Sequence, residues 1–323
     1  MARSTIRGIQ VCYLATMSWV CPAQDTPAIR ARIPKPDQMQ IEQLMPPENL
    51  TSLVTQRRWD EVLNVSLRGL SENPGDSVLH YWAGVACFHQ RDFVQAELSL
   101  RSAEKLGLDT ALLHEALGVT YYAIRQRVLF LQEMHAAIRA DPARSTPYHY
   151  LGRYYEHDAN DYLKAISYFD KALERDPGDF KSLHFRAFCL QMLGRQEEAR
   201  ASYEVAIRHV EASGAAFGWP YQKLAELVLQ TDPHAALEYL QKAVKLDPDV
   251  ASNHLVIAKA LESIGDFAAA IAAGLEAARL KPNDPAIRYV LARLYKKNGN
   301  TAASAEQLKL HEKLRAIYVP SDN

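Results

Sequence analysis

Two His-Glu pairs come closest to a catalytic motif in this sequence. The pairs at residues 114–115 and 311–312 each begin the pattern HExxH. In that pattern two histidines one helical turn apart bind zinc, and the glutamate acts as a general base. Gly118 and Arg315 occupy the places where the second histidine is required. Neither pair supplies both histidine ligands, so we expect no zinc-protease chemistry and no catalytic residues at either place.

Four of the 11 histidines, all in the middle part of the chain, are considered as metal ligands: His89, His149, His157 and His184. Metal ligands must converge on one point, whereas His149 and His157 fall at opposite ends of one expected helix. We therefore predict no metal and no cofactor, and interpret these histidines as solvent-facing or groove-lining. Phosphate-binding (GxxxxGK[ST]) and serine-hydrolase (GxSxG) patterns are absent from the sequence. An enzyme with an unrecognised site is the least favoured hypothesis.

Composition and charge limit the class of partner. The 323 residues include 37 basic and 38 acidic side chains, with 48% hydrophobic residues and 14 glycines. A protein that binds a phosphate backbone usually carries a clustered basic footprint, so we expect no nucleic-acid partner. Cys87 and Cys189 fall in expected helices, where a small buried residue is the simplest interpretation.

The N-terminus differs in character from the rest of the chain. Residues 1–23 combine Arg3 and Arg7, a 12-residue apolar run and small residues before a possible cleavage site after Ala23. This layout predicts a secretory signal peptide, and the run is too short to span a bilayer. We therefore expect export, periplasmic or extracellular, without stable membrane insertion after signal removal. The alternative is an uncleaved extension on a cytoplasmic protein. Residues 24–47 are rich in proline and predict an extended linker.

A recurring helix stop organises the remainder of the sequence. The prolines concerned are separated by 68, 35, 71 and 34 residues, close to one or two times 34: Pro74, Pro142, Pro177, Pro248 and Pro282. Proline lacks a backbone N–H and restricts the residue before it, so each one ends a helix. A fixed period of this length indicates stacked supersecondary units.

The unit at residues 145–177 shows what each repeat must be. Tyr148, Leu151, Gly152 and Tyr155 share one helix face. After a turn, a second helix carries Ala165, Phe169 and Ala172 on one face. Small residues stand where two helices come close, and aromatic residues fill the space between them. One such hairpin cannot bury both of its faces, so it needs a copy on each side.

These residues resemble the tetratricopeptide repeat, whose pattern is a large residue, Leu-Gly, Tyr, Ala, Phe, Ala and Pro at fixed places in 34 residues. The unit at 145–177 matches at every place, and five other units match in part. The resemblance implies an all-α, right-handed superhelical solenoid of stacked antiparallel helix pairs. We expect about eight units over residues 48–318, with a degenerate first and last unit, and a tail at 319–323. The Gly-rich connector at 211–220 lacks the proline stop, so we predict a hinge there.

The resemblance also places a binding surface. In this family the first helix of each pair packs one face into the core and turns another face toward the concave side of the solenoid. We call this concave-side face the first-helix face. Aromatic rings and arginines on such a face suit an extended peptide. The predicted peptide-binding residues are Tyr81, Phe88, Tyr122, His149, Arg153, His184, Lys259, Tyr289 and Arg293. The alternative is that some of these rings pack against neighbouring helices.

The resemblance implies a non-enzymatic scaffold for protein–protein interaction. Together with the predicted signal peptide, we expect this scaffold to bind a partner protein or extended peptide after export. A cytosolic adaptor or assembly factor with the same groove is the alternative. The Lys and Asn pair with which one subclass grips a C-terminal carboxylate is absent, since Tyr81 and Val85 stand at those places in one unit and His149 and Arg153 in another. The partner's identity and the oligomeric state do not follow from the sequence.

Overall fold

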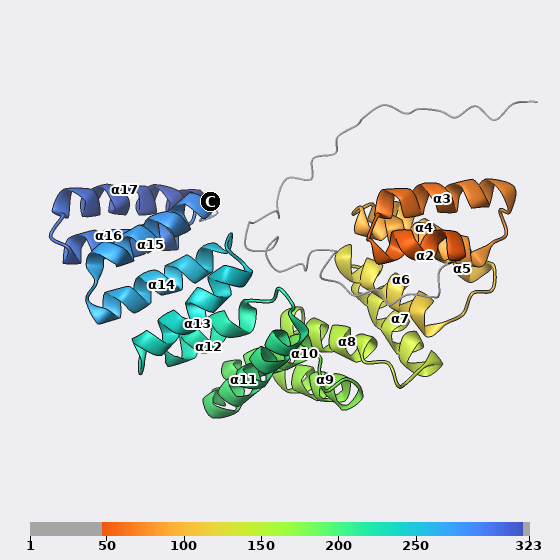
Figure 1. The fold of residues 1–323 in the computed structure, drawn as a ribbon, viewed down its shortest axis with the longest axis horizontal. Coiled ribbons are helices and arrows are strands. Elements are labelled where there is room, and N and C mark those ends of the chain that lie inside the picture. Colours follow the sequence, from red (N-terminus) through yellow and green to blue (C-terminus); the bar gives the residue numbers. More distant parts are fainter. Residues whose placement is uncertain (1–46, 319–323) are drawn as a thin grey trace, which may run out of the picture. The chain divides into compact units, whose positions relative to one another are not determined.

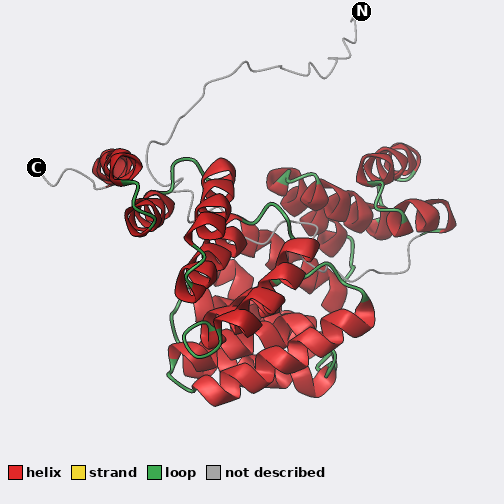
Figure 2. Ribbon diagram, turned by 60° about the vertical axis from the view of Figure 1, so that its left-hand side comes forward, coloured by secondary structure: helices red, strands yellow, loops and turns green. Residues whose placement is uncertain are grey.

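The computed structural model of the protein describes residues 47–318. The predicted signal peptide (1–23), the linker up to residue 46 and the tail (319–323) lie outside the described residues. Within them the structure is helical and has no strand (Figures 1 and 2). The first four helix pairs are α2 (Glu48–Thr55) with α3 (Trp59–Glu72), α4 (Ser77–His89) with α5 (Phe93–Lys105), α6 (Ala111–Ala123) with α7 (Arg127–Ala140), and α8 (Thr146–His157) with α9 (Tyr162–Arg175). The next four are α10 (Phe180–Met192) with α11 (Gln196–Ser213), α12 (Trp219–Val228) with α13 (Pro233–Leu246), α14 (Ala251–Ile264) with α15 (Phe267–Leu280), and α16 (Pro285–Lys297) with α17 (Thr301–Tyr318).

The helices stack in chain order. The two helices of a pair pack against each other, and the second helix of each pair then packs against the first helix of the next. From α4 onward each first helix also contacts the next first helix, whereas successive second helices make no contact within residues 47–318. The first helices therefore share one side of the stack, the side that carries the predicted binding residues. The predicted all-α fold of stacked antiparallel helix pairs is confirmed.

The proline stops act as predicted. The helices α3, α7, α9, α13 and α15 each end two residues before a proline of the series. Aspartate side chains begin many of the helices by accepting hydrogen bonds from free backbone N–H groups of the first turn. Asp76 does so for α4 and Asp179 for α10. Stop and start signals thus stand close together at the junctions between pairs.

The turn inside every pair except α12–α13 has a repeating feature, a residue in the left-handed region of backbone conformation. These residues are Arg57, Arg91, Arg125, Asn160, Gly194, Gly265 and Gly299. Glycine adopts this conformation without steric cost, whereas in L-residues the Cβ atom comes unfavourably close to the backbone. The three N-terminal turns therefore carry strain that the glycine turns do not.

Small residues allow the helices of a pair to approach each other. A Cβ atom at Gly152 would lie 2.6 Å from Cε1 of Phe169, and that ring is fully buried. Ala165 and Ala172 of α9 are also fully buried. The close approach predicted for the unit at 145–177 is therefore present.

The connector at 211–220 changes the local path of the chain. Helix α11 runs on to Ser213 and ends at Gly214, whose φ is 66°. Helix α12 has only 10 residues, and the backbone N–H of Gly218 at its start donates to Asp247 Oδ2 at 2.8 Å. The buried core continues from Val210 to Tyr221 across the connector. The altered helix ending is confirmed, and hinge motion stays a prediction.

The two described cysteines are buried and unpaired, as predicted. Burial raises the pKa of Cys87 to about 11 and that of Cys189 to about 12. Both thiols are therefore protonated near neutral pH and poor nucleophiles. None of the helices within residues 47–318 combines the length and the apolar character needed to cross a bilayer.

Candidate functional site

Tyr81 and Phe88 are the N-terminal members of the predicted first-helix face and lie on α4. Both side chains are fully buried. The Tyr81 ring packs edge-on against Trp82 at 5.4 Å, and the Phe88 ring lies 5.5 Å from that of Phe93 on α5. Their assignment to an accessible binding surface is corrected here. These large rings gain more by leaving water than by lining a surface, and they belong to the core.

Arg153 of α8 holds the middle of the face. Its side chain is 7% exposed, and its guanidinium carbon lies 3.5 Å from the centroid of the Phe185 ring of α10. Its Nη1 lies 3.4 Å from Glu156 Oε2, which is close enough for an ion pair but not aligned as a hydrogen bond. Arg153 Nε and Glu156 Oε2 are both buried without a hydrogen-bond partner. Each such atom costs about 1–3 kcal/mol, which a ligand that hydrogen-bonds to it would recover.

His184 of α10 lies near Arg153, among aromatic rings. Its ring centroid is 4.9 Å from that of Phe185 and 5.9 Å from that of Trp219. Burial holds the pKa of His184 well below 6.5, and the positive charges of Lys223 and Arg153 act in the same direction. The imidazole is therefore neutral at pH 7, and its Nδ1 atom is buried without a hydrogen-bond partner. Trp219 is 39% exposed and marks the open edge of this group.

Tyr122 of α6 completes the group on its N-terminal side. Its ring lies 5.2 Å from that of Phe130 and 6.2 Å from that of Tyr150. Burial raises the pKa of Tyr122, although the Arg153 guanidinium opposes the shift. The phenol stays protonated and can donate or accept a hydrogen bond. We use the name central cluster for Tyr122, Arg153, Glu156, His184, Phe185 and Trp219.

His149 belongs to a Ser-His-Asp set beside the central cluster. Its Nδ1 lies 2.8 Å from Ser182 Oγ and 3.5 Å from Asp179 Oδ2, and Ser182 Oγ donates to the same Asp179 oxygen at 2.5 Å. In a catalytic triad the serine and the aspartate contact different nitrogens of the histidine. Here both contact Nδ1, and Ser182 is fully buried. The set therefore lacks the geometry of a nucleophile activated by a base.

Asp179 fixes the start of α10 and anchors this set. It accepts hydrogen bonds from the backbone N–H groups of Lys181 and Ser182. Burial raises the pKa of Asp179, but the interactions with His149 and Ser182 outweigh burial and hold it well below the usual range. The set therefore positions the first turn of α10 next to the central cluster.

The C-terminal members of the predicted face lie on α14 and α16, where the side chains are charged. Glu262 of α14 is 8% exposed, and its carboxylate lies 2.5 Å from an Arg293 nitrogen and 2.9 Å from Lys297 Nζ. The Lys297 contact is an ion pair that falls short of good hydrogen-bond geometry. Burial raises the pKa of Glu262, but the contacts with Lys297 and Arg293 outweigh it and lower the pKa. Tyr289 is half exposed, and its ring lies 5.4 Å from that of His311.

Nine residues were predicted for the face, and the structure separates them into three groups. Tyr81 and Phe88 are core. Tyr122, Arg153 and His184 come together in the central cluster, with His149 beside it. Lys259, Tyr289 and Arg293 lie on the last two first helices, away from that cluster in the chain.

Known repeat families match the helix pairs that carry this face. Three family models, each described as a tetratricopeptide repeat, match residues 146–179, 168–201 and 226–285. Each matched segment contains first-helix and second-helix residues in the register described above. The chain is a tetratricopeptide repeat protein. This family identifies it as a protein-interaction scaffold.

Similar proteins agree with this assignment. The mouse (Mus musculus) Superkiller complex protein 3 is 26% identical over 248 residues, which is 75% of this chain but 16% of the relative. The chain thus spans about a sixth of the length of that curated relative. A chain of the APC/C hetero-tetramer Cut9–Hcn1 superposes with a TM-score of 0.66 at 16% identity, covering 76% of this chain and 48% of the other. PilW, a type IV pilus biogenesis factor, gives 0.57 at 19% identity, covering 67% and 98%. At these identities the two structures show the fold alone.

One cluster in the tetratricopeptide stack has the composition of a metal site. Ligand atoms of Glu104, His114 and Glu133 lie within 4.8 Å of one another, the one such group in the part of the chain that the structure describes. Arg101 already occupies it, with nitrogens 2.6 Å from Glu104 and 2.9 Å from Glu133. His114 Nδ1 lies 2.7 Å from Glu133. The arginine supplies the positive charge that a metal would bring, so these groups form an ion-pair network between α5, α6 and α7.

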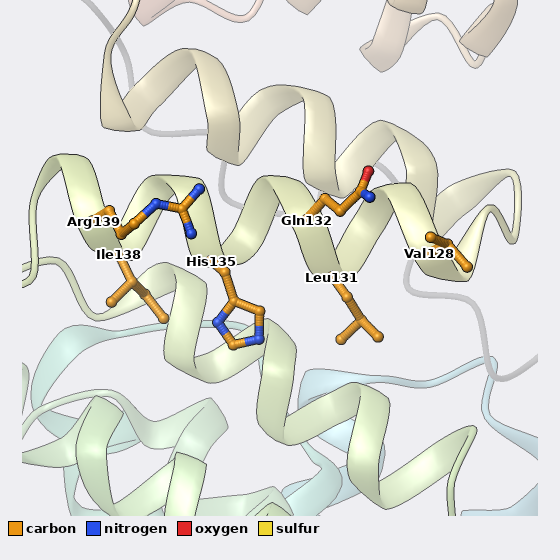
Figure 3. Close-up of a pocket in the computed structure, with 6 residues that line it drawn as sticks. All are labelled: Val128, Leu131, Gln132, His135, Ile138 and Arg139. Carbon is orange, nitrogen blue, oxygen red and sulfur yellow. The ribbon is translucent and has the colours of Figure 1, made fainter.

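A hollow on the second-helix side was not predicted from the sequence. It has a volume of about 560 Å³ and its described lining comes entirely from α7: Val128, Leu131, Gln132, His135, Ile138 and Arg139 (Figure 3). Val128 is 69% exposed. The spacing of Val128, Leu131 and His135 places them on one helix face, which is the signal that could have found it. That face lies on the side opposite the core-facing residues Phe130 and Met134.

Proposed function

We propose that this scaffold binds an extended segment of a partner protein across the central cluster. The observation that carries the proposal is the set of buried atoms without hydrogen-bond partners: Arg153 Nε, Glu156 Oε2 and His184 Nδ1. An extended backbone offers carbonyl acceptors and N–H donors in alternation. A carbonyl can accept from Arg153 Nε, and an N–H can donate to Glu156 Oε2.

Aromatic side chains supply the apolar part of the proposed site. Phe185 is held under the Arg153 guanidinium, and Trp219 is exposed at the edge. Rigid rings contribute large contact area at a low cost in conformational entropy, which is why aromatic residues and arginine dominate protein interfaces. The charged groups set the orientation of the bound segment, and the rings provide contact area.

Site-specific photo-crosslinking tests the proposal in extracts of the source cells. A photoreactive residue replaces Trp219 in the full chain, and a matched control replaces Leu163, which is 66% exposed on the second helix α9. We expect a defined partner to crosslink at position 219 and not at 163. In the Arg153→Lys background, which keeps the charge but removes the Nε donor, the crosslink should weaken strongly. Equal crosslinking at 163, or no effect of Arg153→Lys, would show that the partner binds elsewhere.

We also propose that residues 1–23 direct export and that the scaffold acts outside the cytoplasm. The support is the charge and hydropathy layout of the sequence, which a cytosolic adaptor does not need. N-terminal sequencing of the protein isolated from its own cells tests this. A mature chain that begins at residue 24 supports export, and a chain that retains Met1 favours the cytosolic adaptor.

A further inference from the structure

The first-helix faces of α14 and α16 carry an excess of positive charge. We call Lys259, Arg293, Lys296 and Lys297 the cationic end. Glu262 is the one acidic residue in either helix, and it is neutralised by its contacts with Arg293 and Lys297. Four cations against one carboxylate leave a local positive charge in a chain whose net charge is −1.

The geometry leaves this charge available to a partner. The Arg293 and Lys297 side chains remain 42% and 49% exposed even though they contact Glu262. Lys296 is exposed and Lys259 is partly so, and neither makes an ion pair within residues 47–318. Glu262 thus holds two of the cations in place without covering them.

Acidic residues of the neighbouring elements are engaged elsewhere. Asp266 and Asp284 cap the starts of α15 and α16 through backbone N–H groups. Glu276 pairs with Arg279 on α15. The acids of α17, Glu306 and Glu312, lie on a second helix together with Lys309 and Lys313. These carboxylates act as helix caps, form an ion pair or lie beside lysines of their own helix. They therefore leave the positive charge of the cationic end in place.

We propose that the cationic end is a subsite for a run of aspartate or glutamate residues in a partner protein. This inference rests on the proposed function, because it assigns a chemistry to one end of the same face. Complementary charge across an interface raises the rate of encounter and selects among partners. A nucleic acid is the less favoured anion, because the rest of the chain lacks the extended basic footprint that phosphate backbones require.

Fluorescence anisotropy with the full chain tests the subsite, using a fluorescein-labelled hexaglutamate peptide as the probe. Hexaglutamine of the same length is the uncharged control peptide. The test variant is Lys259→Glu combined with Lys296→Glu, because neither lysine side chain makes an ion pair or a hydrogen bond within residues 47–318. The matched control is Lys309→Glu combined with Lys313→Glu on α17, which changes the net charge equally.

We expect hexaglutamate binding that weakens about tenfold or more in the test variant and less than about twofold in the control, since close charge pairs carry the attraction. It should also weaken as salt rises from roughly 50 to 300 mM, because exposed charges are screened. Equal weakening in both variants would reduce the effect to net charge and overturn the proposal. So would equal binding of hexaglutamine, or tighter binding of a labelled oligouridylate than of hexaglutamate.

The two proposals fail separately. Hexaglutamate binding is measured without any partner and depends on α14 and α16 alone, whereas the crosslink at position 219 reports on the central cluster. Hexaglutamate binding without a crosslink would support the acidic subsite and contradict the binding of a partner segment across the central cluster. A crosslink without hexaglutamate binding would support partner binding at the central cluster and contradict the acidic subsite.

Discussion

The first-helix face carries a buried arginine at its centre and an exposed arginine at its C-terminal end. Arg153 is almost fully buried, stacked on Phe185 and imperfectly paired with Glu156. Arg293 occupies an equivalent place on α16 but is 42% exposed and pairs closely with Glu262. The same repeat position therefore carries a buried arginine in one pair and an exposed arginine in another.

The two regions are suited to different tasks. Buried charges interact strongly and over fixed geometry, so the central cluster can discriminate between ligands. Exposed charges are screened and contribute little to stability, but they attract oppositely charged segments before contact. A repeat fold permits both because each pair is stabilised mainly by its own neighbours.

The largest expected loss of stability comes from replacing Arg153, and the matching replacement of Arg293 should cost far less. Arg153→Met leaves the buried Glu156 carboxylate without its cation, which typically costs 3–5 kcal/mol, roughly. Arg293→Met leaves Glu262 paired with Lys297, so the cost should stay below about 1 kcal/mol. Urea unfolding followed by circular dichroism measures both midpoints. Equal shifts for the two variants would remove the contrast between the two regions.

Packing between the helices of a pair gives the next effect. In Gly152→Ala the new Cβ would lie 2.6 Å from the buried Phe169 ring, whereas in Gly274→Ala it would lie 2.7 Å from a terminal methyl of Leu291. A rigid ring cannot move aside as a methyl can, so Gly152→Ala should cost about 1–3 kcal/mol. Gly274→Ala should be nearly neutral, because alanine favours a helix by about 1 kcal/mol over glycine. Thermal unfolding of the two variants compares them, and a larger loss at Gly274 would contradict this account.

Much of the architecture could be predicted from the sequence because its signals are local. A proline ends a helix whatever surrounds it, and α7 and α9 do end just before Pro142 and Pro177. The small and aromatic pattern of residues 145–177 likewise depends on two helices that are adjacent in the chain. Local chemistry repeated at a fixed period therefore determines the stack.

The candidate site was only partly predictable because burial depends on neighbours. Helical periodicity gives the direction of Tyr81 and Arg153 equally well, yet one is core and the other is part of a polar cluster. The pairing of Glu262 with Arg293 spans one repeat, so the spacing could have suggested it. The hollow beside Val128 was missed because it lies on a second helix, where only the core-facing side was considered.

The ion-pair network around His114 should make the stability of the protein depend on pH. The hydrogen bond with Glu133 raises the pKa of His114 above 6.5, against the opposing effect of burial. The stabilisation is therefore fully present below pH 6.5 and is lost as pH rises through the higher folded-state pKa. His114→Gln should cost roughly 1.5–3 kcal/mol at low pH, typical of a hydrogen bond to a charged group. The loss should shrink at pH 9, and a loss independent of pH would show that the imidazole acts only by packing.

The smallest effect concerns the turns, where the N-terminal and C-terminal pairs also differ. Arg125 has a φ of 62°, whereas Gly265 and Gly299 occupy the corresponding turns without steric cost. Arg125→Gly should stabilise the protein by about 1 kcal/mol, because it relieves the left-handed strain at a modest cost in unfolded-chain entropy. The neighbouring Gln126 has a φ of −81° and makes no capping hydrogen bond, so Gln126→Gly is a matched control that should not stabilise. Urea midpoints decide between them: a gain at both positions, or at neither, would mean that backbone strain does not distinguish the arginine turns from the glycine turns.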